Sequence, residues 1–462
     1  MSIEYYADLL RPHFEGRKFI LIGGPVVGFG EMVRQLRTLG AERPLIIGST
    51  LGAGDPPAEE DALWCSLGVR GADTMDSFYR YEALLRDLPG EIRETVERYD
   101  PERGARVLGA IVLSEVRDVA GRPRYGGRPP SWAALEDKVR IDAFWEAAGV
   151  RHARSLIVAA ERDALGAAAR ELDRGSGTVW AGDARDGIHG GATVTFWVQS
   201  EEAAELAAAR ITARCGRARV MPFLEGIPCS IHGIVFPEGV AAFRPVELIT
   251  LRRPGPNRFL YAGTATFWDP AGADREEMRA IARRVGECLR NRVGFRGLFT
   301  VDGVLSEEGF LPTELNPRAG AGLRGMTTAI PTLPFAPLAI AAQADEALDY
   351  RPETVESLVV EAADARRGGG GWTSFPGNRN RTEIHRLVEE SGRYRLAEGD
   401  EATSATLLTG PSDHGGFLAF TPDRRRIAPG PSLAPRVIEA FRVADQDLGV
   451  ALGPLEAARS VR

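Results

Sequence analysis

Short apolar runs alternate with stretches of helical periodicity in the first part of the chain. Residues 18–24 form an apolar run that ends in glycines, residues 31–39 have a helical pattern, and residues 44–47 form a second apolar run. A strand, a helix and a second strand in this order are typical of a parallel βαβ unit. One or two helices over 82–99 and a buried strand over 107–113 continue the pattern. We therefore predict a parallel α/β domain at the N-terminus.

The middle of the chain continues this alternation after a break. Residues 121–130 (GRPRYGGRPP) are rich in proline and glycine, so we predict a linker and a first domain boundary there. Beyond it the pattern predicts helices at 135–148, 162–172, 201–214 and 274–293, and strands at 155–158, 178–180, 194–198, 220–223, 230–236, 297–304 and 309–315. Strands and helices alternate, which gives an α/β or α+β fold class.

A distinct C-terminal segment begins near residue 355. Residues 368–371 are consecutive glycines and predict a flexible loop, and strands are expected near Thr406 and Phe417. The segment is predicted to be a small C-terminal domain, and we find no internal repeat in the chain.

Composition and charge narrow the class of protein. The chain has 462 residues, and at about 150 residues per domain it predicts about three domains. Its 44% hydrophobic and 26% charged residues are typical of soluble globular proteins and exclude a disordered or collagen-like chain. A net charge of −7 gives no positive field, so we expect no nucleic-acid partner and no binding to anionic membranes.

Three further features concern the location of the protein. The N-terminus carries Glu4 and Asp8 and has no signal-peptide pattern. The longest apolar stretch, residues 332–342, contains two prolines and is too short to span a bilayer. The four cysteines are not closely spaced, and a chain of this size does not need disulfides. We therefore expect a cytoplasmic protein with no membrane partner.

The most specific segment is residues 297–323, GLFTVDGVLSEEGFLPTELNPRAGAGL. It reads as two strands joined by a tight turn. Glu314 and Asn316 are two residues apart and share a face, so they can converge with Asp302 of the first strand. One or two carboxylates with an amide oxygen suit Mg²⁺, and Arg318 offers a planar fork to a phosphate or carboxylate. The alternative is an ordinary hairpin with solvated acids.

The TELNPR sequence of this hairpin resembles the ATP-grasp carboxylate-amine ligases, whose last core hairpin carries an acidic residue and a Glu-x-Asn-x-Arg motif. The resemblance implies that Asp302, Glu314 and Asn316 hold the magnesium ions that bridge the phosphates of ATP. It also implies that Arg318 steadies the transferring phosphoryl group or the acyl phosphate. ATP and Mg²⁺ are thus the implied cofactors.

Other parts of the chain match the same family in the same order. Lys138, one of only two lysines in the chain, matches a lysine that contacts the α and β phosphates. A flexible lid is implied for the glycine-rich loop formed by Gly187, His189, Gly190 and Gly191. The hinge that lines the adenine is implied for Met221, Pro222, Phe223, Leu224 and Glu225. The alternatives are a surface lysine, an ordinary hairpin turn, and an apolar strand that ends in a turn.

One position departs from the family pattern. The family carries a second lysine just before the glycine loop, where this chain has Trp180 and Ala181. Either Arg185 or His189 of the loop supplies the missing charge, or nucleotide handling is altered.

The resemblance further implies a division of the chain and a reaction. Residues 1–130 would be a Rossmann-like pre-ATP-grasp domain, 131–225 and 226–350 the two ATP-grasp subdomains, and 351–462 a small C-terminal domain. A carboxylate would attack ATP to give an acyl phosphate, and an amine would then displace phosphate to form an amide or peptide bond. The oligomeric state stays open, with a homodimer among the alternatives.

The substrates are less well defined by the sequence. Arg324, just after the hairpin, is a candidate catalytic residue at the pocket rim, and Arg244, Glu247 and Arg296 are weaker candidate substrate anchors. The length and layout look most like the peptide ligases of actinobacterial natural-product biosynthesis, such as the pheganomycin ligase. The implied substrates are a small-molecule or peptide carboxylate and an amine, within secondary metabolism.

Two other functions remain open. A regulatory or scaffold protein with the same fold would bind nucleotide without turnover, and Trp180 and Ala181 favour this alternative. A Rossmann-type oxidoreductase would use the glycines of residues 23–30 (GGPVVGFG). That segment lacks G-x-G-x-x-G, and Phe29 stands where a P-loop needs lysine, so neither phosphate-binding motif is present.

Overall fold

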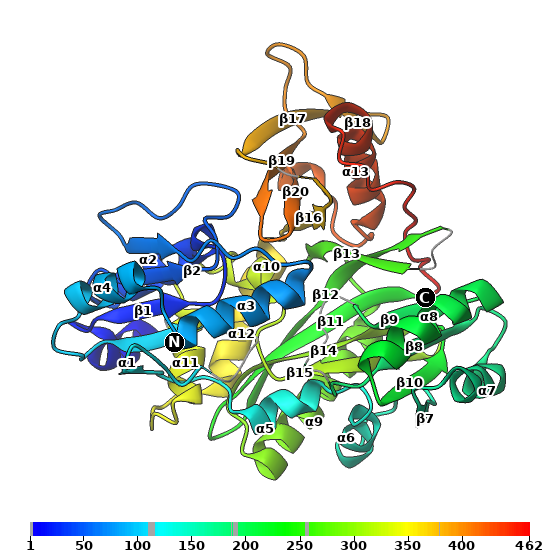
Figure 1. Ribbon diagram of the computed structural model, residues 1–462, viewed down its shortest axis with the longest axis horizontal. Helices are drawn as coiled ribbons and strands as arrows, with labels where there is room; N and C mark the ends of the chain where they lie inside the picture. The colour runs from blue at the N-terminus through cyan, green and yellow to red at the C-terminus, as the bar shows by residue number, and fades with distance from the viewer. Residues whose placement is uncertain (1–2, 110–115, 186, 188–192, 255–257, 378) are drawn as a thin grey trace.

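The computed structural model describes residues 3–109, 116–185, 187, 193–254, 258–377 and 379–462. A parallel sheet of order β3-β2-β1-β4 forms the N-terminal lobe, shown in blue in Figure 1. The predicted apolar runs are its central strands, and every residue of both is buried. The elements of this lobe are α1 (Ile3–Phe14), β1 (Phe19–Ile22), η1 (Val26–Phe29), α2 (Gly30–Thr38), β2 (Leu45–Gly48), β3 (Leu63–Ser66), α3 (Thr74–Arg86), α4 (Gly90–Tyr99) and β4 (Arg106–Gly109). The parallel α/β prediction is confirmed, and residues 110–113 of the predicted last strand lie outside the described residues.

A second, antiparallel sheet follows, with strand order β7-β10-β8-β9. Its strands are β7 (Leu156–Ala159), β8 (Thr178–Gly182), β9 (Thr195–Val198) and β10 (Arg217–Pro222). Helices α7 (Arg162–Leu172) and α8 (Glu201–Arg214) have the predicted bounds and share one apolar core with this sheet. The other face of this sheet turns toward the large sheet described below, where Met221 packs against Leu311, and the space between these two sheets is called the cleft.

The single helix predicted at 135–148 is wrong. The chain forms α5 (Pro130–Ala133) and the short η2 (Ala134–Glu136), and α6 starts only at Ile141 and ends at Ala147. Between them the Asp137 side chain accepts a hydrogen bond from the backbone N–H of Val139 at 3.2 Å. An aspartate that bonds its own local backbone competes with the helix, so the helical path breaks here. Lys138 consequently lies in a turn.

The largest element is a continuous ten-stranded sheet of order β15-β14-β11-β12-β13-β16-β20-β19-β17-β18. Its first half contains β11 (Ile227–Val235), β12 (Val240–Arg253), β13 (Arg258–Ala265), β14 (Gly297–Ser306) and β15 (Gly309–Asn316), backed by α9 (Gly272–Val293). The predicted hairpin is β14 and β15. The long β12 and β13 were not predicted.

The flexible loop predicted at 368–371 is wrong, because three of its four glycines open strand β16 (Gly369–Phe375). A Cβ added to Gly370 would lie 2.2 Å from the Phe420 carbonyl oxygen, and one added to Gly371 would lie 2.5 Å from Val437. Glycine is needed where strands and a helix approach this closely.

The remaining elements are β5 (Asp118–Val119), β6 (Arg122–Pro123), α10 (Leu323–Thr327), α11 (Phe335–Gln343), α12 (Pro352–Ala365), β17 (Glu383–Glu390), β18 (Arg393–Leu396), β19 (Ala405–Ser412), β20 (Gly415–Pro422), η3 (Arg424–Arg426) and α13 (Ala434–Leu448).

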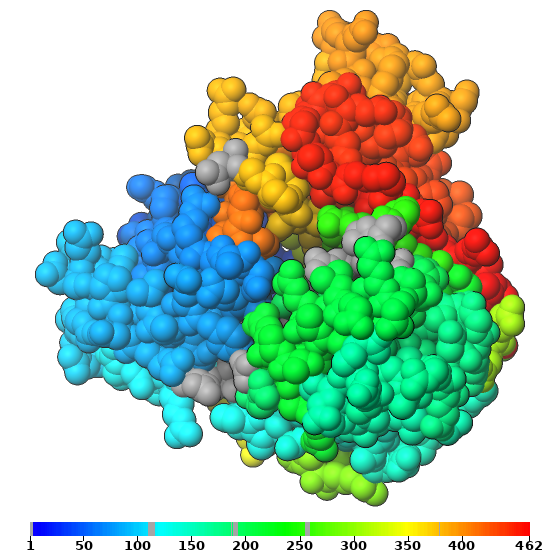
Figure 2. All heavy atoms as spheres, turned by 45° about the vertical axis from the view of Figure 1, so that its right-hand side comes forward, coloured from blue at the N-terminus to red at the C-terminus, as the bar shows by residue number. Residues whose placement is uncertain are grey.

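The three parts of the molecule meet around a common centre. Figure 2 shows a hollow between the blue N-terminal lobe, the orange and red C-terminal lobe, and the green middle of the chain. All four cysteines are free. Within the described ranges, the helices are either too short or too polar to cross a membrane.

Candidate active site

The β14–β15 hairpin brings the predicted carboxylates together. Asp302 and Glu314 are direct cross-strand partners, and Thr300 and Asn316 form the next pair on the same face. The Asp302 carboxylate accepts hydrogen bonds from the Ser230 hydroxyl on β11 and, at 2.8 Å, from the Asn316 amide. Asp302, Glu314 and Asn316 thus converge as the TELNPR motif implies.

The electrostatics of this pair favour a bound cation. Burial raises the pKa of the Asp302 carboxyl, and the Glu314 charge raises it further. The hydrogen bond from Ser230 and the charges of Arg318 and Lys138 lower this pKa, but by less. Two carboxylates held together at a buried position gain stability from a divalent ion. Across the described ranges no three His, Cys, Asp or Glu side chains form a complete cage. A site of two carboxylates and an amide fits Mg²⁺, which takes further oxygens from water and phosphates.

Two cations lie beside these carboxylates. Lys138 Nζ is 3.4 Å from Glu314 Oε1. Arg318 donates from Nη2 to Asn316 Oδ1 at 2.8 Å and from Nε to Glu136 Oε1 at 3.0 Å. The buried Glu136, which also pairs with Arg128, therefore fixes the direction of the Arg318 fork. The sequence reasoning missed Glu136, because it lies far along the chain from the hairpin.

The predicted hinge connects the two sheets that form the cleft. Met221 at the end of β10 shares a small apolar cluster with Ala153 and with Leu311 of β15, and Val179 and Leu224 pack against it. This cluster joins the antiparallel sheet to the hairpin. A flat apolar group bound beside Met221 would contact side chains of both the antiparallel sheet and the hairpin.

The rest of the hinge packs between β9 and β12. Pro222 is the last residue of β10, and the Phe223 ring stacks on Trp197 of β9 at 4.2 Å. Glu225 pairs with Arg252 of β12, which donates from Nη1 at 3.1 Å. Burial would raise the pKa of Glu225, but hydrogen bonding to Arg252 and its charge lower it. Glu225 therefore braces the hinge against β12 as a charged carboxylate.

Only part of the predicted glycine loop lies within the described residues. Gly187 has φ 104°, and a Cβ added to it would lie 2.2 Å from the Tyr79 hydroxyl of α3. Gly187 therefore has to be glycine where the loop meets the N-terminal lobe. His189, Gly190 and Gly191 lie outside the described residues, so their role stays a prediction.

A buried arginine faces the position of the missing lysine. Trp180, Ala218 and Val220 point into the core beneath α7 and α8, so Ala181 and Arg219 point into the cleft. These two residues are direct cross-strand partners. Arg219 is 2% exposed. A charged residue between the apolar Ala218 and Val220 is the sequence signal that could have revealed it.

The Arg219 guanidinium is held close to the start of α6. It lies 2.7 Å from Asp142 Oδ1 and donates from Nε to the Ser155 hydroxyl at 3.2 Å. Asp142 is in the first turn of α6, shortly after Lys138. The Arg219 charge is thus paired with Asp142 on the face of the sheet that lies away from α7 and α8.

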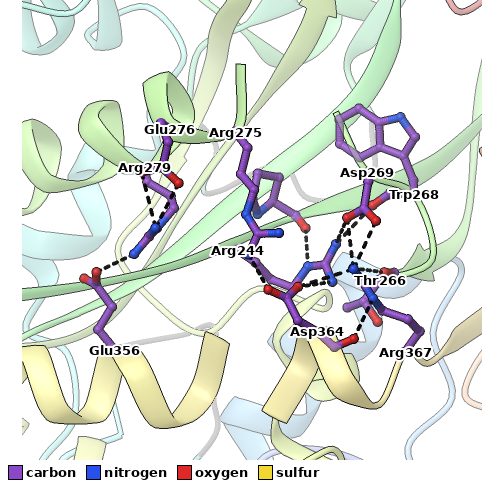
Figure 3. Close-up of polar contacts among 11 residues, drawn as sticks. Arg244, Thr266, Trp268, Asp269, Arg275, Glu276, Arg279, Glu356, Asp364 and Arg367 are labelled. Atoms are coloured by element: carbon purple, nitrogen blue, oxygen red, sulfur yellow. Dashed lines mark hydrogen bonds and ion pairs between the residues drawn. The ribbon is translucent and has the colours of Figure 1, made fainter. Parts of the chain in front are cut away.

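Arg244 lies outside this cluster. It is fully buried and donates to Asp364 at 2.8 Å, to Asp269 at 2.6 Å and to the Trp268 carbonyl at 3.2 Å. Figure 3 shows Arg275 paired with Asp364, and Arg367 paired with both carboxylates. Because its donors are occupied by the protein, Arg244 ties β12 to the end of α12 instead of facing a substrate.

Among the described residues, none of the other candidate anchors forms a hydrogen bond or ion pair with Asp302 or Glu314. Glu247 is 1% exposed and accepts hydrogen bonds from Ser432 and, at 2.8 Å, from the N–H of Leu433 at the start of α13. Arg296 precedes β14 and donates to the Phe295 carbonyl at 2.8 Å. Arg324 is exposed on α10, and within the described ranges its guanidinium has no hydrogen-bond or ion-pair partner.

Glu247 gives a prediction about pH and stability. Burial raises its pKa, against the hydrogen bonds from Ser432 and Leu433. The folded protein therefore holds this proton at a pH where the unfolded chain, with an ordinary pKa of about 4.3, has lost it. The contribution of Glu247 to the free energy of unfolding is therefore largest at low pH. It falls by about 1.4 kcal/mol per pH unit as the pH rises from the unfolded to the folded pKa.

The Glu247→Gln variant removes this titration. We expect its free energy of unfolding in urea to gain on that of wild type as the pH rises above about 4.3, up to the pKa that Glu247 has in the folded protein. The exposed Glu202→Gln variant is the control and should run parallel to wild type. Parallel curves for Glu247→Gln as well would contradict the raised pKa.

Comparisons with known proteins give no match in sequence: no family model matches the chain, and no curated protein is significantly similar to it. Its structure is similar to a biotin carboxylase from Campylobacter jejuni in complex with β-γ-ATP. That similarity has a TM-score of 0.54 at 12% identity and covers 97% of this chain and 94% of the other.

Two further solved structures are similar over most of their length. One is a carboxyaminoimidazole ribonucleotide synthase from Aspergillus clavatus complexed with ATP, with a TM-score of 0.53 at 14% identity, covering 93% of this chain and 99% of the other. The second is an L-amino acid ligase from Bacillus licheniformis, with a TM-score of 0.51 at 11% identity, covering 88% and 94%. At such identities the similarity establishes architecture, and the chain accordingly has the ATP-grasp fold that its TELNPR hairpin predicted.

Proposed function

We propose that this protein is an ATP-dependent ligase that joins a carboxylate to an amine. The observation that carries the proposal is the convergence of Asp302, Glu314, Lys138 and Arg318 at one end of the cleft. Two carboxylates beside two cations suit a metal-bound triphosphate better than a neutral substrate. ATP-grasp neighbours solved with nucleotides support the same assignment.

The proposed reaction has two steps. The substrate carboxylate attacks the γ-phosphate of ATP, which gives an acyl phosphate and ADP, and an amine then displaces phosphate to form the amide. Magnesium held by Asp302, Glu314 and Asn316 would offset the charge of the nucleotide phosphates. Lys138 contacts the phosphates, and Arg318, oriented by Glu136, stabilises the oxygens on which charge gathers. Water has to be excluded, because acyl phosphates hydrolyse.

The substrate class is a further part of the proposal. We infer an amino acid or modified amino acid as the acid and an amino acid or peptide as the amine, as in secondary metabolism. The structural similarity to an L-amino acid ligase supports this choice. The exposed Arg324 on α10 remains a candidate for holding the substrate carboxylate at the pocket rim, with Arg296 as a weaker one.

A second candidate function is nucleotide binding without turnover. Ala181 favours it, because the implied second phosphate-binding lysine is absent there. Arg219, fixed directly opposite Ala181, weighs against it.

The oxidoreductase alternative has less support. Parallel sheets of this kind bind ligands at the carboxyl ends of their strands. There the Asp413 carboxylate accepts hydrogen bonds from Ser49 at 3.0 Å and Thr50 at 2.6 Å. The turn between β19 and β20 thus lies where a dinucleotide would bind.

The test is magnesium-dependent release of ADP and phosphate from ATP with pooled amino acids and short peptides, followed by product mass. Release that requires both an acid and an amine, with a new product mass, supports the ligase. Release of AMP and pyrophosphate would contradict the acyl-phosphate mechanism. Binding of ATP without any release would favour the second candidate.

Arg219 gives a prediction about nucleotide binding, which both candidates share. In Arg219→Ala we expect about tenfold weaker binding of ATP, since one charge-assisted contact is lost. Adding Ala181→Lys returns a positive charge to the same cross-strand pair, so the double variant should recover most of the affinity. Affinity is measured by calorimetry with Mg²⁺ and a non-hydrolysable ATP analogue. Equal affinities in all three proteins would show that Arg219 is only structural.

A further inference from the structure

Tyr261 of β13 has a buried hydroxyl without a partner. The hydroxyl oxygen has no hydrogen-bond acceptor or donor among the described residues. An unpaired buried polar group typically costs about 1–3 kcal/mol, so such groups in native structures call for an explanation. Its position in the cleft suggests one.

The Tyr261 ring is fixed by its neighbours on two strands. Thr250 of β12 is its direct cross-strand partner. On the other side β13 pairs with β16, and the Trp372 ring packs edge-on against the tyrosine ring at 5.8 Å and 80°. The C-terminal segment therefore contributes one side of the packing that holds Tyr261.

The side chain points into the cleft. Phe259, two residues earlier on the same strand and hence on the same face, lies 6.1 Å from Trp197 of β9 in a parallel arrangement. This face of β13 is thus the one that meets the antiparallel sheet.

Tyr261 and Asp302 lie on the same face of the large sheet, because Asp302 pairs with Ser230, Ser230 pairs with Val246, and Thr250, four residues beyond Val246, pairs with Tyr261. Burial raises the pKa of Tyr261, and the Asp302 carboxylate raises it further. The phenol therefore stays protonated and can act as a donor.

We propose that the Tyr261 hydroxyl donates a hydrogen bond to an anionic oxygen of the group that reacts beside Asp302. This inference rests on the proposed function. The oxygen belongs to the phosphoryl group or to the substrate carboxylate, which offer the same acceptor chemistry. The hydroxyl then gains the acceptor that the protein does not provide, and it adds a neutral donor to the charges of Lys138 and Arg318.

The Tyr261→Phe variant removes only the hydroxyl. We expect binding of inorganic phosphate to the protein loaded with Mg²⁺ and ADP, measured by calorimetry, to weaken about 10- to 100-fold. Binding of ADP itself should be unchanged. The melting temperature should stay the same or rise, because an unpaired buried group is lost.

Tyr99→Phe is the matched control. The Tyr99 hydroxyl donates to the Phe19 carbonyl at 3.1 Å in the N-terminal lobe, so this variant should melt at a lower temperature and bind phosphate normally. A ligand contact thus changes phosphate binding without lowering the melting temperature, and a structural contact lowers the melting temperature without changing phosphate binding.

The possible outcomes distinguish a failure of the Tyr261 contact from a failure of the proposed ligase function. Weaker phosphate binding assigns the contact to the phosphoryl group, and unchanged phosphate binding with a raised KM for the acid assigns it to the carboxylate. If phosphate binding and the KM for the acid both stay at wild-type values, the inference is overturned while ligase activity can stand. If phosphate binding weakens but wild type releases no ADP with any acid and amine, the proposed function fails and the contact remains.

Discussion

Replacing Glu314 by glutamine is expected to reduce acid- and amine-dependent ADP release about 10³-fold. Glu314 is the cross-strand partner of Asp302 and the nearest carboxylate to Lys138. Metal-assisted charge stabilisation supplies several kcal/mol, and a loss of about 4 kcal/mol corresponds to about 10³ in rate. Glutamine keeps the size and removes the charge, so the fold should be retained.

The measurement is the initial rate of ADP release at several magnesium concentrations. In Glu314→Gln the half-saturating magnesium concentration should rise along with the loss of rate. Glu307→Gln is the control, since Glu307 is exposed at the turn of the same hairpin. Wild-type turnover in Glu314→Gln would show that the hairpin carboxylates do not take part in the reaction, and the proposed function would lose its basis.

Arg318→Lys gives the second large effect, a loss of about 10²-fold in turnover. The guanidinium uses one nitrogen for Glu136 and another for Asn316, which orients the fork. Lysine keeps the charge but is a single point donor without this geometry. Removal of one aligned donor to a developing oxyanion typically costs about 10²–10³ in rate.

The measurement for Arg318 separates turnover from binding. Single-turnover ADP release should fall in Arg318→Lys while the affinity for the nucleotide stays within about threefold, because a positive charge remains at the site. The exposed Arg393→Lys on β18 serves as control. A variant that keeps wild-type turnover and loses nucleotide affinity would assign Arg318 to ground-state binding instead.

The sequence predicted those elements whose pattern is local. Helices α7 and α8 have the predicted bounds, because alternation of apolar and polar residues with a helical period needs no information from elsewhere. The glycines 368–371 were assigned to a loop for the same local reason, whereas the close approach of Phe420 and Val437, far along the chain, requires them in a strand. The β12 and β13 strands were missed, since they mix charged and apolar residues.

The residues of the candidate site likewise fall into those that a local pattern predicts and those that it does not. Asp302, Glu314, Asn316 and Arg318 share one hairpin, so their spacing alone predicts that they meet. Arg219 and Tyr261 depend on the register between strands, which no local pattern contains. Their role becomes visible only when Ala181 and Trp372 are known to lie beside them.

The continuity of the large sheet has a consequence for any attempt to divide the chain. Strand β16 covers the outer edge of β13, so a chain that ended at residue 365 would leave β13 with a row of unpaired N–H and C=O groups. Exposed edges of this kind pair with other chains and aggregate. The first part of the large sheet and the C-terminal segment therefore share one hydrogen-bonded edge, and that segment can be shortened or exchanged only if another strand covers the same edge.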